Sequence, residues 1–280
     1  MQLERILLFF AKYIESELGI VYADHNYFQL QNRLEEIAKL LSVESIEKLF
    51  TQAEAGITGP FKQLLLDLAT NNETSFFRDP RVFKAIENVV IPNFLQNEPQ
   101  GTQLRIWSGA SSTGQEALSL AMLISEWNLK TLKNIPFSIL GTDISERILL
   151  RAQKADYSQL EVQRGLPTPY LVKYFQKNDQ DRWIANSTLT SHIQFKKQNL
   201  LAPFAFSQKF HLILLRNVLI YQALPSKIEI LRRVTDMLAP GGVLILGSGE
   251  SLLGLSSDYH QTAHEGAVIY LKKEFHQSAA

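Results

Sequence analysis

The 280-residue sequence has no cysteine, no net charge and no long uninterrupted apolar segment. The lack of cysteine excludes disulfides, thiolate catalysis and cysteine-ligated zinc. Because 28 basic side chains balance 28 acidic ones, we expect no strong electrostatic field for nucleic acid. The most apolar stretch, residues 210–221, is interrupted by Arg216 and Asn217 and is shorter than the roughly 20 apolar residues of a membrane span. These absences predict a cytoplasmic protein that neither binds nucleic acid nor inserts into a membrane.

The first 70 residues carry helical patterns only. Apolar residues recur at helical spacing from Leu3 to Leu18, and charged residues such as Glu4 and Lys12 interrupt the run, which excludes a signal peptide. Further helices are expected over residues 26–41, from residue 45, and over 61–69. We therefore predict an N-terminal all-helical domain over residues 1–70.

From about residue 101, short apolar strands alternate with helical stretches. The expected strands cover residues 104–108, 137–142, 193–198, 210–215, 242–247 and 267–272, and the expected helices cover 115–127, 146–155 and 227–238. This alternation predicts an α/β domain with a parallel sheet and helices on both faces. We place it at residues 101–280, after a linker and domain start at 71–100, with a small insertion at about 157–192.

The segment RIWSGASSTGQE, residues 105–116, joins the first strand to the following helix. Ligands of open α/β sheets bind at the carboxyl ends of such strands, and small residues let the backbone approach them closely. Only Gly109 and Gly114 are glycines, so the G-x-G-x-x-G fingerprint of nicotinamide enzymes is missing. Glu116, in the first helical turn, either contacts a ligand or interacts with the helix dipole.

An aspartate ends the second strand. Asp143 is well placed to accept hydrogen bonds from both hydroxyls of a ribose. Alternatively it caps the next helix, although Ser145 offers a cap as well. The loop and the aspartate together favour a ligand that contains a ribose.

Two further segments are rich in unexpected polar groups. TNNETSFFRDP, residues 70–80, predicts either a cleft wall from which Arg78 clamps a carboxylate, or a helix capped by Thr74 or Ser75 with buried aromatics and a surface arginine. The residue pattern alone favours the second interpretation. LLRNVLIYQ, residues 214–222, places Arg216, Asn217 and Tyr221 after an apolar strand, which is typical of a binding site.

Other chemistries lack their motifs. The six histidines form no H-E-x-x-H pattern, and His260 and His264 lack a strong helical context, so we expect no metal site. The G-x-S-x-G elbow of serine hydrolases is absent.

Taken in order, these segments resemble the CheR family of chemotaxis receptor methyltransferases. The residues that carry the resemblance are NETSFFRD (72–79), RIWSGASSTGQEALSLA (105–121), YSQLEVQRGLP (157–167), GTDIS (141–145), QNLL (198–201), LLRNVLIY (214–221) and LAPGGVLILGSGESL (238–252). The resemblance implies a class I, Rossmann-like methyltransferase sheet with a small inserted β-subdomain and an N-terminal helical domain. It also implies transfer of a methyl group from S-adenosylmethionine to glutamates on the cytoplasmic helical bundle of chemoreceptors, with S-adenosylhomocysteine as product. We expect a monomer.

The resemblance also implies site residues. The expected cofactor-binding residues are Asn72, Thr74, Arg78, Glu116, Asp143, Asn199, Leu200, Arg216 and Asn217, and the expected residues near the methyl acceptor are Arg78 and Tyr221. Asp143 would hold the ribose, Asn199 the adenine and Glu116 the ammonium group of the cofactor. A glutamate acceptor is already ionised at neutral pH, so no catalytic base is expected.

Some positions depart from the family pattern. Gln115, Ala117 and Leu118 replace an acid and a Pro-Tyr pair, and Gln222 replaces an aromatic. Residues 1–56 contain five basic and nine acidic side chains, where many family members have a basic second helix. Two alternatives therefore stay open: a methyltransferase of the same fold with another acceptor, and a cofactor-binding scaffold without turnover.

Overall fold

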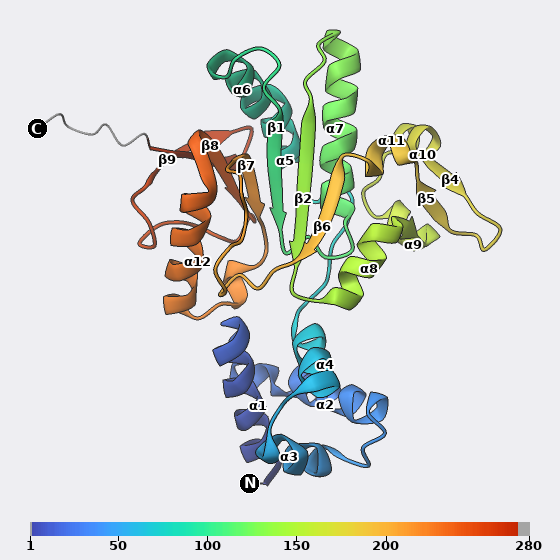
Figure 1. The fold of residues 1–280 in the computed structure, drawn as a ribbon, viewed down its shortest axis with the longest axis vertical. Coiled ribbons are helices and arrows are strands. Elements are labelled where there is room, and N and C mark those ends of the chain that lie inside the picture. Colours follow the sequence, from blue (N-terminus) through green and yellow to red (C-terminus); the bar gives the residue numbers. More distant parts are fainter. Residues whose placement is uncertain (1, 274–280) are drawn as a thin grey trace, which may run out of the picture.

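The computed structural model describes residues 2–273, and Figure 1 shows a helical unit below a larger α/β unit. Residue 1 and residues 274–280, the two ends of the predicted domains, lie outside the described range. No helix in residues 2–273 is long and apolar enough to cross a membrane.

The helical unit contains the helices that its periodicity predicts. Its elements are α1 (Gln2–Leu18), the 3-10 turn η1 (Asp24–Asn26), α2 (Tyr27–Leu40), α3 (Ile46–Ala55) and α4 (Gly59–Ala69). The buried positions of α1 follow helical spacing, and Phe10 and Ile14 are fully buried among side chains of the other helices. Ser45 begins α3 by accepting a hydrogen bond from the Lys48 amide.

A seven-stranded sheet forms the centre of the α/β unit within the described residues, in the order β6-β2-β1-β7-β8-β10-β9. The strands are β1 (Leu104–Gly109), β2 (Phe137–Asp143), β6 (Ile193–Lys197), β7 (Phe210–Leu215), β8 (Leu238–Leu246), β9 (Tyr259–His264) and β10 (Ala267–Lys272). The first five strands in this order are parallel to one another. Strand β10 pairs antiparallel with β8, and β9 pairs antiparallel with β10. The predicted α/β fold is thus confirmed.

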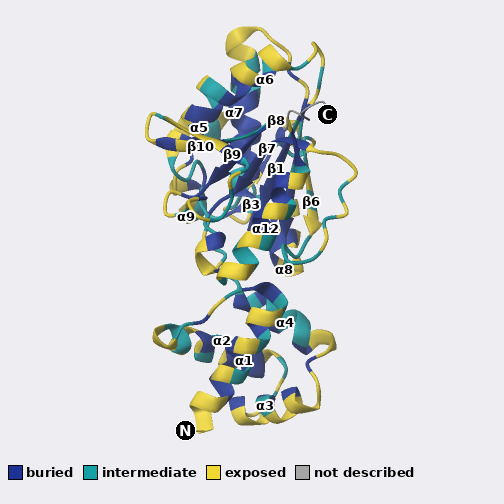
Figure 2. Ribbon diagram, turned by 90° about the vertical axis from the view of Figure 1, so that its left-hand side faces the viewer, coloured by how far each residue is buried: buried dark blue, intermediate teal, exposed yellow. Residues whose placement is uncertain are grey.

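Helices cover both faces of this sheet (Figure 1). Neighbouring strand residues alternate between the faces, so that Ile106 joins one hydrophobic core and Trp107 the other. The helices of the α/β unit are α5 (Pro80–Ala85), the π-helical turn η2 (Ile86–Val90), α6 (Ile91–Asn97), α7 (Gln115–Thr131), α8 (Glu146–Lys154) and α12 (Leu224–Met237). Figure 2 shows the buried strands enclosed by helices whose outer surfaces are exposed.

A small β-subdomain interrupts the chain between α8 and β6. It contains β3 (Asp156–Tyr157), α9 (Gln159–Gln163), α10 (Thr168–Tyr174), β4 (Phe175–Lys177), β5 (Trp183–Ala185) and α11 (Ser187–Thr190). Its strands pair antiparallel in the order β3-β5-β4. The predicted inserted subdomain is therefore present, at the side of the main sheet (Figure 1).

The aromatic pair in the segment before α5 packs against this insertion. The Phe76 ring lies 5.0 Å from the ring of Tyr157, and the Phe77 ring lies 5.5 Å from that of Tyr170. The favoured interpretation was therefore right about buried aromatics but wrong about a helix capped by Thr74 or Ser75. The helix begins only at Pro80, after a left-handed Asp79, because a residue before proline is disfavoured in the helical conformation.

The helical unit is joined to the α/β unit by backbone hydrogen bonds just after α1. The Val21 amide donates to the Tyr221 carbonyl (2.9 Å), and the Ala223 amide donates to the Gly19 carbonyl (2.8 Å). We call residues 17–21 and 221–223, with these bonds, the interdomain seam. The seam lies next to the carboxyl edge of the sheet.

Candidate functional site

A cleft lies between the helical unit and the carboxyl edge of the parallel strands. Its walls come from residues 18–33, the segment 69–78, the loop 110–116 and the ends of β2, β6 and β7. All ten predicted site residues line this cleft: Asn72, Thr74, Arg78, Glu116, Asp143, Asn199, Leu200, Arg216, Asn217 and Tyr221. The structure thus brings together residues that are up to 149 positions apart in the chain.

The loop after β1 has an unusual backbone. Ala110 and Ser112 adopt left-handed conformations, with φ of 53° and 50°, which L-residues adopt at a cost of roughly 1–3 kcal/mol. The hydroxyl of Ser111 between them is buried and has no hydrogen-bond partner within residues 2–273. Backbone strain beside an unpaired buried hydroxyl is typical of a ligand-binding loop.

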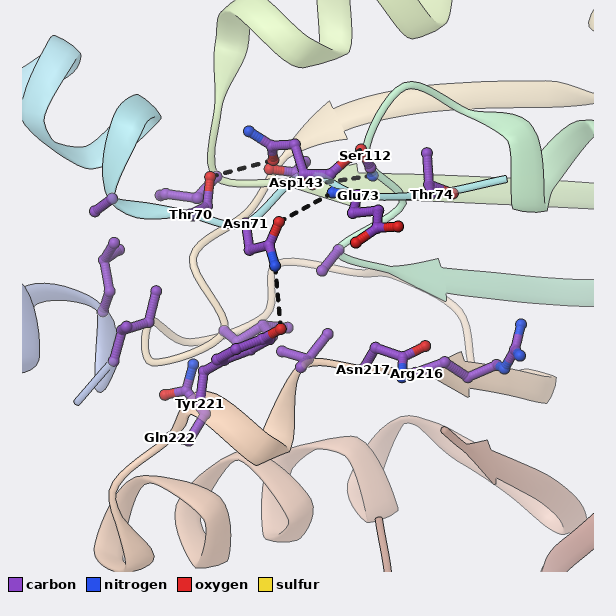
Figure 3. Close-up of a pocket in the computed structure, with 18 of the residues that line it drawn as sticks. Thr70, Asn71, Glu73, Thr74, Ser112, Asp143, Arg216, Asn217, Tyr221 and Gln222 are labelled. Atoms are coloured by element: carbon purple, nitrogen blue, oxygen red, sulfur yellow. Dashed lines mark hydrogen bonds between the residues drawn. The ribbon is translucent and has the colours of Figure 1, made fainter. Parts of the chain in front are cut away.

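Asp143, at the end of β2, is hydrogen-bonded to this loop. Its carboxylate accepts a hydrogen bond from the Ser112 amide at 3.0 Å (Figure 3). It accepts a second one from the Ser145 amide, also at 3.0 Å. Burial raises the pKa of Asp143, although the amide donors oppose this effect. The hydroxyl of Ser145 caps α8 through the Ile148 amide, so the alternative of Asp143 as the cap is wrong.

Glu116 and Arg216 form a buried ion pair across the cleft floor. The Glu116 Oε2 atom lies 2.9 Å from Arg216 Nη1, and Glu116 Oε1 accepts a hydrogen bond from Ser108 Oγ at 2.7 Å. Arg216 Nη2 also donates to the Arg78 carbonyl (2.7 Å), while Arg216 Nε is buried without a partner in the described residues. The pair connects β1, α7, β7 and the segment before α5.

The segment 70–78 crosses the front of the cleft. Ser112 Oγ donates to the Asn72 carbonyl (2.8 Å), which attaches this segment to the strained loop. The Arg78 guanidinium donates to the Glu73 carbonyl (3.0 Å) and is only partly buried. Arg78 is therefore a cation at the cleft wall, as the cleft-wall interpretation expects.

Tyr221 lies at the mouth of the cleft. Its side chain is 39% exposed, and its hydroxyl accepts a hydrogen bond from Asn71 Nδ2 at 3.1 Å (Figure 3). Asn199 lies deeper and is attached to the helical unit, because its Nδ2 donates to the Glu17 carbonyl (2.8 Å). This bond uses one of the two hydrogens on the amide nitrogen, and the other is left to donate to a ligand. The contact of Asn199 with adenine stays a prediction.

Several cleft residues were not expected from the sequence. The helical unit contributes Tyr22, Asn26, Gln29 and Arg33, the last three on successive turns of one face of η1–α2. Spacing of polar residues on one helical face is the signal that could have found them. Within residues 2–273, no group of three or more histidine, aspartate or glutamate side chains is arranged to hold a metal ion.

Gln222 explains one departure from the family pattern. Its side chain is buried at the seam, and with the amide nitrogen facing α1 it donates to the carbonyls of Leu18 (2.9 Å) and Gly19 (3.2 Å). These are carbonyls at the C-terminus of α1 that have no partner within the helix. The amide at position 222 therefore attaches the two units through hydrogen bonds to the backbone at the end of α1.

The sheet order and the cleft at its carboxyl edge define an α/β protein of the class I methyltransferase type. The comparison with known proteins gives the family. Residues 72–268 match the family described as "CheR methyltransferase, SAM binding domain". The chain belongs to the CheR methyltransferase family.

Curated relatives cover almost the whole chain. It is 34% identical over 266 residues to "Chemotaxis protein methyltransferase Cher2" of Pseudomonas putida, with 94% of this chain and 96% of that protein covered. It is 32% identical to "Chemotaxis protein methyltransferase 1" of Pseudomonas aeruginosa, with the same coverage. It is also 32% identical to "Chemotaxis protein methyltransferase" of Vibrio parahaemolyticus, with 94% and 95% covered. The recognised family and the enzyme class are thus confirmed.

Proposed function

We propose that this protein transfers a methyl group from S-adenosylmethionine to glutamate side chains of chemoreceptor cytoplasmic helices. The observation that carries the proposal is the convergence of all ten predicted residues on one cleft, in a chain of the CheR family. The products are a glutamyl methyl ester and S-adenosylhomocysteine. We further propose that the enzyme acts as a cytoplasmic monomer without a metal ion, and that its domains are 1–70 and 101–280, joined by 71–100.

The residues present fit this cofactor. Ser111 Oγ and Arg216 Nε, both from residues that line the cleft, are buried polar atoms without a partner in the described part of the chain. Such atoms are typically satisfied by a polar ligand. When bound, the cofactor supplies an electrophilic methyl group on a sulfonium centre.

The side chains of the cleft bind and orient the reactants. Asp143 accepts hydrogen bonds from the ribose, Asn199 and Leu200 contact the adenine, and Glu116 binds the ammonium group. Asn72, Thr74, Arg216 and Asn217 complete the cofactor wall. Arg78 pairs with the methionine carboxylate or with the acceptor glutamate, and Tyr221 orients the acceptor at the mouth.

The reaction needs alignment more than proton transfer. The acceptor carboxylate is ionised at neutral pH, so one of its oxygens forms the new bond to the methyl carbon while the carbon–sulfur bond breaks. The electron pair of that bond stays on sulfur, and no proton moves. Holding the two reactants in line within a cleft that excludes water is the contribution of the protein.

A transfer assay tests the proposal. The protein is incubated with methyl-labelled S-adenosylmethionine and cytoplasmic fragments of the chemoreceptors of its host, and the product is then treated with base. We expect receptor-bound label that base releases as methanol, and much less label with the Asp143→Ala variant. Label on another molecule would favour a different acceptor, and cofactor binding without any transfer would favour the scaffold alternative.

A further inference from the structure

The carboxylate of Glu250 accepts hydrogen bonds from the backbone of the loop that leads to Tyr221. Glu250 Oε2 accepts hydrogen bonds from the amides of Asn217 (2.8 Å) and Gly247 (2.7 Å). Glu250 Oε1 accepts from the amides of Val218 (2.9 Å) and Ile220 (3.2 Å). Glu250 itself does not line the cleft.

The loop requires such an acceptor because it has left the sheet. Strand β7 ends at Leu215, so the amides that follow have no neighbouring strand to bond. Asn217 is left-handed, with φ of 59°, which turns successive amides toward a common point. A carboxylate has about four acceptor positions, and here it meets four amides.

The Glu250 turn and the loop are in tight contact. A Cβ atom added at Gly247 would lie 2.8 Å from the Asn217 amide nitrogen and 2.8 Å from Glu250 Oε2. Leu219, in the same loop, is 2% exposed and packs in the core beneath. The loop is therefore fixed by hydrogen bonds to Glu250 and by the packing of Leu219 in the core.

Tyr221 follows immediately and depends on this arrangement. Its amide donates to the Val218 carbonyl (3.2 Å), which closes the 3-10 turn η3 (Leu219–Tyr221). The turn sets the direction of the tyrosine ring toward Asn71 at the cleft mouth (Figure 3). The position of Ile220 and Val218 thus determines where the Tyr221 hydroxyl lies.

We propose that Glu250 is a positioning residue for methyl transfer: its carboxylate fixes the backbone of 217–220 and thereby orients Tyr221 toward the methyl acceptor. This inference rests on the proposed function. It assigns a role to a residue that is 29 positions from Tyr221 in the chain and outside the cleft.

The test compares Glu250→Gln, Glu250→Asp and the exposed control Glu54→Gln. The Glu250→Gln variant replaces one oxygen by an NH2 group that faces two amide donors, whereas Glu250→Asp keeps both oxygens. We measure kcat and KM for the receptor fragment and, separately, the Kd for S-adenosylmethionine by equilibrium dialysis. We expect Glu250→Gln to lower kcat roughly tenfold or more, because small misplacements of reacting groups are costly. Cofactor Kd should change clearly less than kcat, because Asn217 and its neighbour Arg216 are the only proposed cofactor residues next to the loop that Glu250 holds, whereas Asp143 and the loop 110–116 lie on other strands.

Partial recovery of kcat in Glu250→Asp would support a carboxylate-specific role. Unchanged kcat in Glu250→Gln, or a loss of cofactor affinity as large as the loss of kcat, would overturn the inference. Amide hydrogen exchange gives a readout that needs no methyl acceptor. The exchange rate over residues 217–221 should rise in Glu250→Gln. If Glu250→Gln does not fold, the same measurement is made on Glu250→Asp. If the wild-type protein methylates no receptor fragment, the proposed function fails, and unchanged exchange would then overturn the role of Glu250 independently.

Discussion

The carboxylate of Glu116 and the guanidinium of Arg216 meet at 2.9 Å, although the two residues are 100 positions apart. Their side chains are 14% and 3% exposed, so both charges are largely withdrawn from water. A buried charge that loses its partner is costly because neither water nor another group replaces it. The pair therefore both shapes the cleft and makes the fold sensitive to its loss.

Replacing Glu116 by glutamine should lower the free energy of unfolding by roughly 2–3 kcal/mol, the contribution of a hydrogen bond to a charged group. Urea denaturation measures this change. The matched control is Glu87→Gln, which breaks the more exposed pair with Lys130 and should cost less than about 1 kcal/mol. Equal losses of unfolding free energy in the two variants would show that the buried pair stabilises the fold no more than the exposed pair does.

The Asp143→Ala variant should bind S-adenosylmethionine roughly 10- to 100-fold more weakly, because two charge-assisted hydrogen bonds to the ribose are lost. Isothermal titration calorimetry measures the affinity, with Asp236→Ala on the exposed side of α12 as control. Unchanged affinity would refute the ribose assignment.

The same aspartate predicts a pH dependence of cofactor binding. Burial raises the pKa of Asp143, so its proton is taken up at a higher pH than in an ordinary aspartate. The protonated side chain is a weaker acceptor, and affinity should therefore fall with decreasing pH earlier than an exposed carboxylate would predict. The Kd measured between pH 7 and pH 4 should rise in the wild type and stay flatter in Asp143→Ala.

Gly19 and Gly254 form a natural pair of probes for the interdomain seam. Both have φ of +73°, but an added Cβ at Gly19 would lie 2.3 Å from the side-chain amide of Gln222 and 2.8 Å from Ser226 Cβ, whereas nothing lies within 4 Å at Gly254. Both alanine variants carry the same backbone strain, and only Gly19→Ala adds overpacking of about 1–3 kcal/mol. We expect Gly19→Ala to unfold at lower urea concentration and to lose methyl transfer, while Gly254→Ala keeps it. Equal activity in both would mean that the seam does not support the site.

His211 lies near the start of β7, at the edge of the sheet opposite the cleft. It should make the free energy of unfolding depend on pH. Burial, and secondly the charge of Arg105, lower the pKa of His211 to about 4. The unfolded chain therefore binds a proton more readily than the folded one between about pH 6.5 and pH 4. The free energy of unfolding is highest above pH 6.5 and falls by roughly 3 kcal/mol as the pH drops to 4. Denaturation of His211→Gln should lack this slope, and the exposed His260→Gln variant should retain it.

Local patterns were sufficient to predict most of the fold. Each of the six predicted strands is present. The run 210–215 is apolar and buried on both faces, whereas β6 is an edge strand with exposed Gln194, Lys196 and Lys197. Strand β9 was missed because its exposed, polar residues show no alternation. Strand β8 begins at Leu238 rather than at residue 242, since the Pro-Gly-Gly turn signal lies inside an irregular pairing with β7.

The predicted site residues reached one cleft, but their mutual contacts were beyond the sequence. The pairing of Glu116 with Arg216, and of Asn199 with the Glu17 carbonyl, depends on how distant segments pack. The role of Gln222 was also hidden, because its partners are backbone carbonyls that any sequence would supply. Side chains that bond to the backbone leave no complementary residue in the sequence to reveal them.

The Val21 amide holds the carbonyl of Tyr221, the residue proposed to orient the methyl acceptor. This hydrogen bond links the position of the helical unit to the position of Tyr221. By thermodynamic reciprocity, a ligand that binds the docked helical unit more tightly must also favour the ordered tyrosine, and a ligand that orders the tyrosine must favour docking. A ligand of the helical unit would thus act on the acceptor site through Gly19, Ile20 and Val21, the three residues after the end of α1.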